Sequence, residues 1–221
     1  AVACAALLPV GLRAQQLGLL AACMSPSCLI EGSWWACILG IFVNYAMHAF
    51  IWYRPNQFSA ACQRPPLHAL GSGPMEVFAS LEVVAKLLQC ASLALFLGAD
   101  GRAAVAGALV SAPAWCWAVF VTFLAVGQWL NFAMYAAIGN AGVYYGFKLG
   151  RTVQWCNGFP FNVGLRHPQY VGVVLTLLGA LVVLLCDGLA KLGLPQAVVL
   201  WAAAYGAMSA MEQAGDNDKS S

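Results

Sequence analysis

Four long stretches of this chain contain no lysine, arginine, aspartate or glutamate. They are bounded by Glu31 and Arg54, by Arg102 and Lys148, by Arg166 and Asp187, and by Lys191 and Glu212. A helix crosses a bilayer with roughly 20 apolar residues, and each stretch supplies that length. We therefore expect an all-α, polytopic integral membrane helical bundle of about four transmembrane helices.

The overall composition points to the same class of protein. Of the 221 residues, 62% are apolar and only 8% are charged, whereas about a quarter of the residues in a soluble domain are charged. A net charge of +2 with dispersed basic residues gives no support for a nucleic-acid partner. The sequence has no HExxH, GxSxG or GxxxxGK[ST] motif, so nothing in it favours metal, serine-hydrolase or P-loop chemistry.

Aromatic residues, prolines and glycines mark the ends of the predicted spans. Trp52-Tyr53 closes the first span, as in the aromatic belt at a membrane interface. A tight turn over 98–102 follows the second span, Pro113 opens the third, and the glycines from Gly139 onward end it. The predicted spans are 33–53, 75–97, 114–138 and a final helical hairpin of 169–186 and 195–211.

The chain divides into three predicted parts. Residues 1–32 are an N-terminal extension, either the remnant of a processed presequence or a fifth, interfacial or spanning apolar helix. Residues 33–212 form the transmembrane domain. Residues 213–221 form a polar C-terminal tail.

Basic residues predict which ends of the spans share one side of the membrane. Six of the basic residues fall on one side and three on the other. The six are Arg54, Arg64, Lys148, Arg151, Arg166 and Lys219. The positive-inside rule assigns that side to the cytosol or its topological equivalent, and it places Arg166-His167 and Glu212 together there.

The polar cluster from Arg166 to Tyr170 stands at the entrance of an apolar span. Pro168 suits the first turn of a helix, whose free N–H groups and positive dipole end would lie beside Arg166 and His167. Such a site suits a carboxylate or a phosphate. Glu212 is either an interfacial carboxylate that reaches water or, if it lies near this cluster, a ligand-binding residue.

Other polar residues within the spans permit two interpretations. Gln128 and Asn131 lie on nearly one helical face and could bond a ligand or a neighbouring helix. For Glu82 and Lys86, one turn apart, we favour a hidden charge pair over a catalytic one. His48 is equally compatible with a structural and a functional role.

The block from Gly127 to Gly172 resembles the central region of the phospholipid N-methyltransferases, and especially of plant-type phosphatidyl-N-methylethanolamine methyltransferases. Its RHPQY segment is similar to the wider superfamily that includes isoprenylcysteine carboxyl methyltransferases. Its YYG and FPFN segments indicate the phospholipid branch. A looser resemblance extends over about 44–212, which makes residues 33–212 a transmembrane methyltransferase domain.

The resemblance implies transfer of methyl groups from S-adenosylmethionine, with S-adenosylhomocysteine as product, to the headgroup amine of a phospholipid, ending at phosphatidylcholine. In animal relatives a GxG motif and a pair of glutamates describe the cofactor site. Here the first position reads Ala125-Val126-Gly127 and the second reads Met211-Glu212. In plant-type members the GxG motif and the pair of glutamates look similarly reduced.

The resemblance also suggests a role for each matching residue. Arg166 and His167 would hold the carboxylate of the cofactor, Tyr170 and Glu212 would frame it, and Gly127 would permit its close approach. His167 or Glu212 would accept the proton of the substrate amine. The predicted cofactor-binding set is completed by Ala125, Val126, Gln128, Asn131 and Met211, and the predicted substrate-binding residues are Tyr145 and Phe161.

Two other functions compete with this hypothesis. The chain could be a catalytically reduced methyltransferase fold that serves as a structural subunit of a larger membrane complex. Carboxyl methylation of a prenylated cysteine is disfavoured by the FPFN segment and by the short chain. The family default for location is the endoplasmic reticulum, with a mitochondrial or plastid membrane as the alternative.

Overall fold

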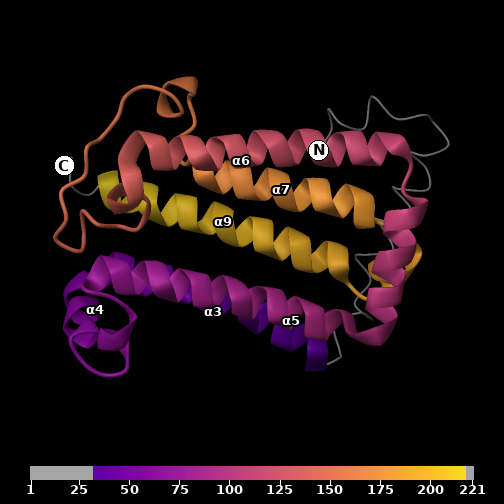
Figure 1. Cartoon of the computed structure of the whole chain (residues 1–221), viewed down its shortest axis with the longest axis horizontal. Helices are drawn as coiled ribbons and strands as arrows, with labels where there is room; N and C mark the ends of the chain where they lie inside the picture. Colours follow the sequence, from indigo (N-terminus) through magenta and orange to yellow (C-terminus); the bar gives the residue numbers. More distant parts are fainter. Residues whose placement is uncertain (1–31, 218–221) are drawn as a thin grey trace.

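Five long helices lie side by side in the computed structural model, which describes residues 32–217 (Figure 1). They are α3 (Gly32–Tyr53), α5 (Pro74–Ser111), α6 (Ala114–Val143), α7 (Pro168–Leu184) and α9 (Leu194–Asn217). The short elements are α4 (Pro55–Cys62), α8 (Asp187–Lys191) and the 3-10 helices η2 (Leu67–Leu70) and η3 (Phe161–Val163). The predicted extension over 1–32 lies almost entirely outside the described residues.

Three of these helices are long and apolar enough to cross a membrane alone. They cover Pro74–Gly98, Ala114–Val143 and Leu194–Ala214, and two shorter apolar helices cover Cys37–Tyr53 and Pro168–Leu184. The expected number of about four spans lies between the three that qualify by length and the five that lie together. The prediction of an all-α membrane bundle is confirmed.

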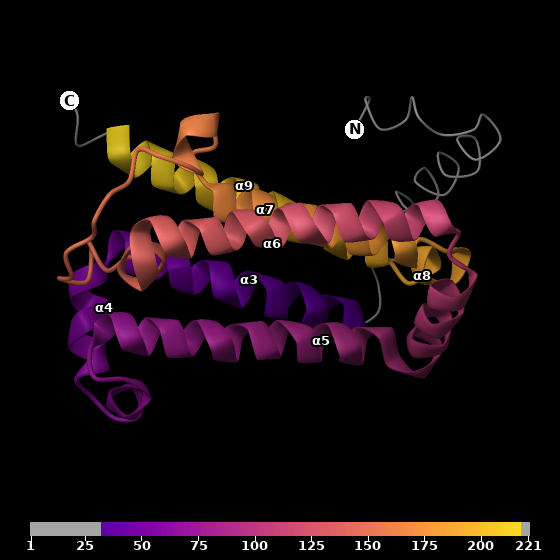
Figure 2. The same ribbon diagram turned by 45° about the horizontal axis from the view of Figure 1, so that its top comes forward.

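The turn predicted over 98–102 is concentrated at a single residue. Gly98 has φ 58° and ψ −156°, a conformation that glycine adopts without steric cost. Asp100, Gly101 and Arg102 are already helical, and the segment from 99 to 111 crosses the end of the bundle toward α6 (Figure 2). The prediction of a turn over 98–102 was therefore wrong in its length, because Gly98 alone changes the direction of the chain.

The start of the predicted tail is also helical. The last helix α9 continues beyond Met211 to Asn217, so residues 213–217 extend the helix, whereas the candidate span ends at Ala214. The remainder of the tail lies outside the described residues.

The two loops that carry five of the basic residues lie at one end of the bundle, which we call the α4 end. The connections 54–73 and 144–167 both lie there, next to the last turn of α9 (Figure 1). This arrangement puts Arg54, Arg64, Lys148, Arg151 and Arg166 at the same end, as the alternation of loops predicted.

Helices α6 and α7 form the most extensive helix pair. Gly127 and Gly172 face each other at their crossing, where a Cβ on either would lie 2.4 Å from the carbonyl oxygen of the other. Such small residues allow two helix backbones in a membrane to approach closely. The crossing holds α7 in place, and with it the residues at the start of α7.

Candidate active site

A buried carboxylate forms the centre of the polar site at the α4 end. Glu212, near the end of α9, is 7% exposed. Its Oε1 accepts hydrogen bonds from the hydroxyls of Tyr145, at 2.5 Å, and of Tyr170, and its Oε2 lies 3.1 Å from His167 Nδ1. The imidazole of His167 stacks on the Tyr170 ring, with centroids 5.5 Å apart. Three separate segments therefore meet on one carboxylate.

Local sequence explains how the start of α7 presents these groups. His167 is the N-cap residue and Pro168 occupies the first turn, where its missing N–H costs nothing. Tyr170 follows within the same turn. The side chains of His167 and Tyr170 thus reach Glu212 from one helix end, and Arg166 precedes them, with its Nη1 3.5 Å from Gln213 Oε1.

Tyr145 reaches the site from the turn that follows α6. Its φ of 52° is unusual for a residue with a side chain, and a bulky residue in this region costs roughly 1–2 kcal/mol. The side chain is 4% exposed and its ring stacks on Phe78, with centroids 5.6 Å apart. Packing and the bond to Glu212 together hold the unfavourable backbone, which is a pattern found at functional sites.

The Tyr145 phenol is a permanent hydrogen-bond donor. Burial, and secondarily the negative charge of Glu212, raise the pKa of Tyr145 well above its usual value. The hydroxyl therefore stays protonated at any physiological pH and supports the ionised carboxylate.

A cavity of about 150 Å³ opens beside this cluster. As the sequence predicted, Arg166, His167 and Glu212 line the same cavity, and so do Tyr145, Tyr170 and Phe161. Aromatic side chains also line the cavity, among them Trp52, Phe147 and Trp155. The cavity thus combines a cation, an imidazole and a carboxylate with aromatic surface.

The other predicted cofactor residues lie elsewhere. Ala125 and Val126 are exposed on α6, and Gly127 packs against α7. Gln128 donates from Nε2 to Thr176 Oγ1 of α7 at 3.2 Å, so it bonds a neighbouring helix. Met211 packs among the core side chains. The geometry does not bring these five to the Glu212 cavity, and their cofactor role stays a prediction.

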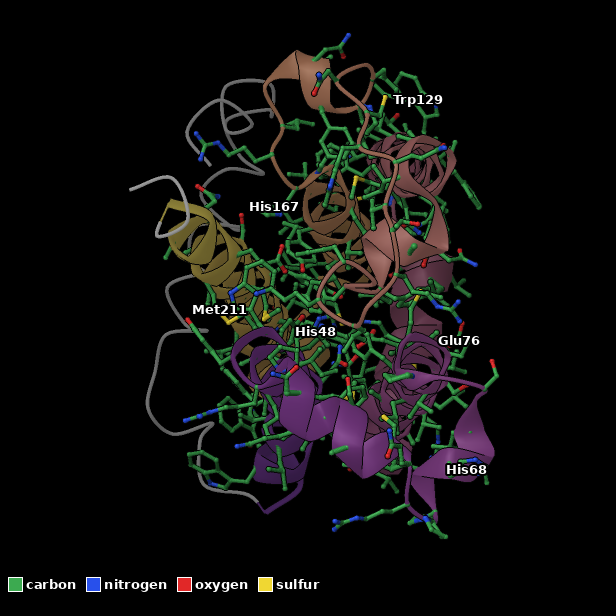
Figure 3. The ribbon with its side chains drawn as sticks, turned by 90° about the vertical axis from the view of Figure 1, so that its left-hand side faces the viewer. His48, His68, Glu76, Trp129, His167 and Met211 are labelled. Atoms are coloured by element: carbon green, nitrogen blue, oxygen red, sulfur yellow. The ribbon has the colours of Figure 1, made fainter. Side chains whose placement is uncertain are left out.

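A second polar cluster adjoins the first. His48 on α3 contacts Tyr145 Oη through Nδ1, at 3.1 Å, and Glu82 Oε1 through Nε2, at 2.7 Å. Glu82 Oε2 lies 3.8 Å from Lys86 Nζ. The predicted pairing of Glu82 and Lys86 and the burial of Glu82 are confirmed, whereas Lys86, with a side chain 46% exposed, is not hidden as expected. His48 and His167 both point into the bundle, whereas His68 lies at its edge (Figure 3).

The sequence contained a signal for this cluster that our interpretation missed. Asn44 and His48 are four residues apart on one span, as are Glu82 and Lys86 on the next. Two polar pairs at helical spacing on consecutive spans are expected to face each other, because neither can face lipid. No group of three or more potential metal ligands occurs within residues 32–217.

Residues 115–214 match the sequence model of the family described as Phospholipid methyltransferase. The chain is similar to phosphatidyl-N-methylethanolamine N-methyltransferase of Arabidopsis thaliana, with 32% identity over 143 residues, which cover 65% of this chain and 75% of that protein. No solved structure matches significantly. The matched region contains α6, α7 and all but the end of α9, and therefore every segment that meets at Glu212.

Proposed function

This chain belongs to the phospholipid methyltransferase family, and from that premise we propose that it methylates phosphatidyl-N-methylethanolamine and its dimethyl form. The methyl donor would be S-adenosylmethionine and the lipid product phosphatidylcholine. The observation that carries the proposal is the meeting of Glu212, His167 and two tyrosines beside Arg166 in one cavity.

The side chains around Glu212 fit the methyl donor. Its amino-acid end carries an ammonium, which Glu212 could bind, and a carboxylate, which Arg166 and His167 could bind. Its sulfonium and adenine suit an aromatic wall such as that of Trp52, Phe147 and Trp155. When bound, S-adenosylmethionine supplies an electrophilic methyl group on sulfur.

The residues of the chain would align the amine and remove its proton. The ammonium of the substrate must lose a proton before its nitrogen can attack. Glu212, in contact with His167, is placed to accept that proton. The nitrogen then forms a bond to the methyl carbon while the carbon–sulfur bond breaks, and the electron pair stays on sulfur. Fixed alignment of the two substrates and exclusion of water would supply much of the rate enhancement.

Radiolabelled methyl transfer tests this function. The purified full chain in phosphatidylcholine vesicles would be supplied with unmethylated, monomethylated or dimethylated phosphatidylethanolamine. We expect label in the last two lipids, and a loss of about 10²-fold or more in Glu212→Gln, as is typical for removal of a proton acceptor.

Glu76→Gln is the matched control, because Glu76 bonds Arg151 at 2.7 Å outside the Glu212 cavity. Wild-type protein that neither transfers label nor binds the methyl donor would defeat the proposal and favour the structural-subunit hypothesis.

A further inference from the structure

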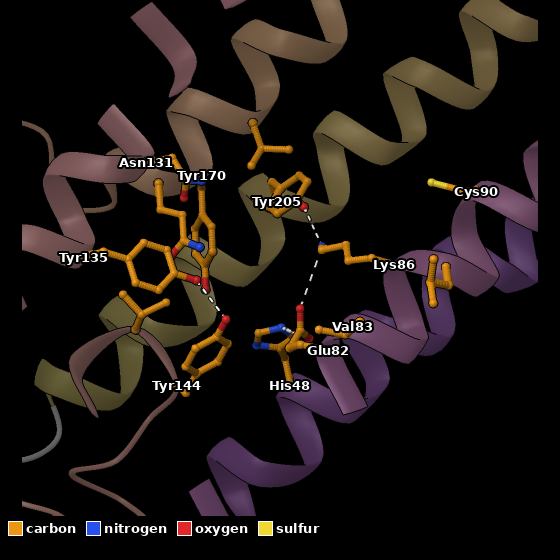
Figure 4. A pocket seen from close by; sticks show the side chains of 14 residues that line it. His48, Glu82, Val83, Lys86, Cys90, Asn131, Tyr135, Tyr144, Tyr170 and Tyr205 are labelled. Atoms are coloured by element: carbon orange, nitrogen blue, oxygen red, sulfur yellow. Dashed lines mark hydrogen bonds and ion pairs between the residues drawn. The ribbon is translucent and has the colours of Figure 1, made fainter. Parts of the chain in front are cut away.

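A second, larger cavity lies between α5, α6, α7 and α9, next to the Glu212 cavity. Its volume is about 380 Å³, and several charged and hydrogen-bonding side chains line it although the helices around it are apolar (Figure 4). Its charged and hydrogen-bonding residues include Glu82, Lys86, Asn131, Tyr135, Gln169 and Tyr205. Such a lining is costly within a span, which makes it a candidate for binding a polar ligand.

The charges in this cavity are of both signs, and each one contacts polar side chains of a neighbouring helix. Glu82 is 9% exposed and bonds His48. With the amide of Asn44 oriented so that its nitrogen faces Glu82, Asn44 donates to Oε1 at 2.6 Å and accepts from Lys86 Nζ at 3.2 Å. Lys86 also donates to Tyr205 at 3.1 Å. A carboxylate and an ammonium therefore stand one helical turn apart.

Lys86 is the less confined of the two charges. Its side chain is 46% exposed, and its distance to Glu82 is 3.8 Å, longer than a direct hydrogen bond. The buried Oδ1 of Asn131, which also lines the cavity, has no hydrogen-bond partner among the described residues. The cavity therefore offers a cation that can turn toward a ligand and an acceptor that lacks a donor.

The cavity faces the lipid side of the bundle. Helices α5 and α6 hardly touch each other, although α5 packs on α3 and α6 packs on α7. Two α5 residues of the cavity lining are strongly exposed, Val83 at 60% and Leu87 at 65%. An amphiphile could thus place acyl chains against Val83 and Leu87 and its polar end inside.

We propose that this cavity is the headgroup site for the phospholipid, with Glu82 bound to the ammonium and Lys86 to the phosphate. This assignment rests on the proposed function and names the part of the molecule that selects a zwitterionic substrate. The ligand carries one charge of each sign, and so does the site, so both charges are neutralised where the dielectric constant is low.

The position of the cavity suits the reaction at Glu212. Val143, Gln169 and Tyr170 line both cavities. A chain of hydrogen bonds runs from Glu82 through His48 and Tyr145 to Glu212. The proton that the ammonium releases ends on Glu212, directly or along this chain, and the nitrogen keeps its electron pair for the new bond to carbon.

Kinetics with two charge-removing variants test the site. Lys86→Met and Glu82→Gln should each lower kcat/KM for phosphatidyl-N-methylethanolamine by about tenfold or more, the loss expected for one charge-assisted hydrogen bond. For Lys86→Met most of the loss should lie in the KM for the lipid, with affinity for S-adenosylmethionine within about twofold of wild type. Glu76→Gln, on the same helix but outside the cavity, should match wild type.

A steric pair of variants keeps every charge in place. Val83→Phe narrows the cavity between α5 and α6. Gly206→Phe instead fills a third cavity, between α7 and α9, where an added Cβ meets no atom within 4 Å. We expect Val83→Phe alone to raise the KM for the lipid. The reverse result would place lipid entry between α7 and α9 and overturn the proposal.

Direct binding separates this proposal from the proposed function. Calorimetry with water-soluble diheptanoyl phosphatidyl-N-methylethanolamine should show binding to wild-type protein and a loss of about tenfold in Lys86→Met. If wild-type protein transfers no methyl group yet shows this pattern, the function fails and the headgroup site stands. Folded Lys86→Met and Glu82→Gln proteins that bind the lipid with wild-type affinity would overturn the headgroup site.

Discussion

The hydroxyl of Tyr145 joins the two polar clusters, and its removal tests whether they form one network. Tyr145→Phe leaves the ring in its packing against Phe78 and Trp52. It removes the donor to Glu212 at 2.5 Å and the partner of His48 Nδ1 at 3.1 Å. The substitution therefore changes hydrogen bonding with almost no change in buried apolar area.

The expected cost follows from these two contacts. A hydrogen bond to a charged group contributes about 1.5–3 kcal/mol, and a buried nitrogen left without a partner costs about 1–3 kcal/mol more if nothing replaces it. Tyr170 still donates to Glu212, which reduces the first contribution. We expect Tyr145→Phe to lower the free energy of unfolding by about 2–4 kcal/mol.

Tyr135→Phe is the matched control, because the Tyr135 hydroxyl bonds only a neutral partner, Tyr144, at 2.8 Å. Its loss should be about 0.5–1.5 kcal/mol. Both variants would be unfolded by titration with sodium dodecyl sulfate in mixed micelles. Equal losses in the two variants would refute the inference that the Tyr145 hydroxyl binds an ionised carboxylate.

Two further predictions concern pH and helix packing. The pKa of Tyr145 is raised in the folded protein, whereas the pKa of a tyrosine in the unfolded chain is about 10. Below pH 10 the phenol is neutral in both states and its contribution to stability is complete; above pH 10 the unfolded chain loses this proton, and the contribution decreases. The difference in unfolding free energy between wild type and Tyr145→Phe should therefore shrink above pH 10, as followed by the same titration. Gly127→Ala places a Cβ 2.4 Å from the Gly172 carbonyl oxygen and should destabilise the protein by about 1–3 kcal/mol, whereas Gly107→Ala, with no atom within 4 Å, should not. A fully stable Gly127→Ala that fails to bind S-adenosylmethionine would instead support the role predicted for Gly127 at the cofactor.

The order of spans and the gathering of Arg166, His167 and Glu212 were accessible from the sequence. Charge-free stretches predicted all the spans except 75–97, which carries Glu76, Glu82 and Lys86, and the alternation of loops then placed all three residues at one end of the bundle. That argument needs only to know whether an odd or an even number of membrane spans separates two residues. It locates residues near a membrane surface but does not orient them around a helix axis.

The orientation of each helix around its axis was much harder to predict. Apart from the pairs Asn44/His48 and Glu82/Lys86, the spans are apolar on all sides, so no other polar face indicates which side of a helix points inward. The contact of His48 with Glu82 depends on the rotation of α3 against α5. The contact of Tyr145 with both clusters depends on a positive φ in a non-glycine residue, and no composition rule predicts that conformation. Gly127 was assigned to the cofactor from family resemblance, whereas its neighbours show a helix crossing.

The crossing of α6 and α7 has a consequence for how a two-chain lipid could enter and leave. Their backbones meet at Gly127 and Gly172, so these two helices move as one body and keep His167 and Tyr170 fixed relative to α6. No comparable contact joins α5 to α6. We therefore expect lipid exchange to widen the gap between α5 and α6 by a shift of the α3–α5 pair, which otherwise packs on α9 and α7, and each shift would carry His48 and Glu82 away from Tyr145. In this protein, release of the product and interruption of the hydrogen-bonded chain would then be the same motion.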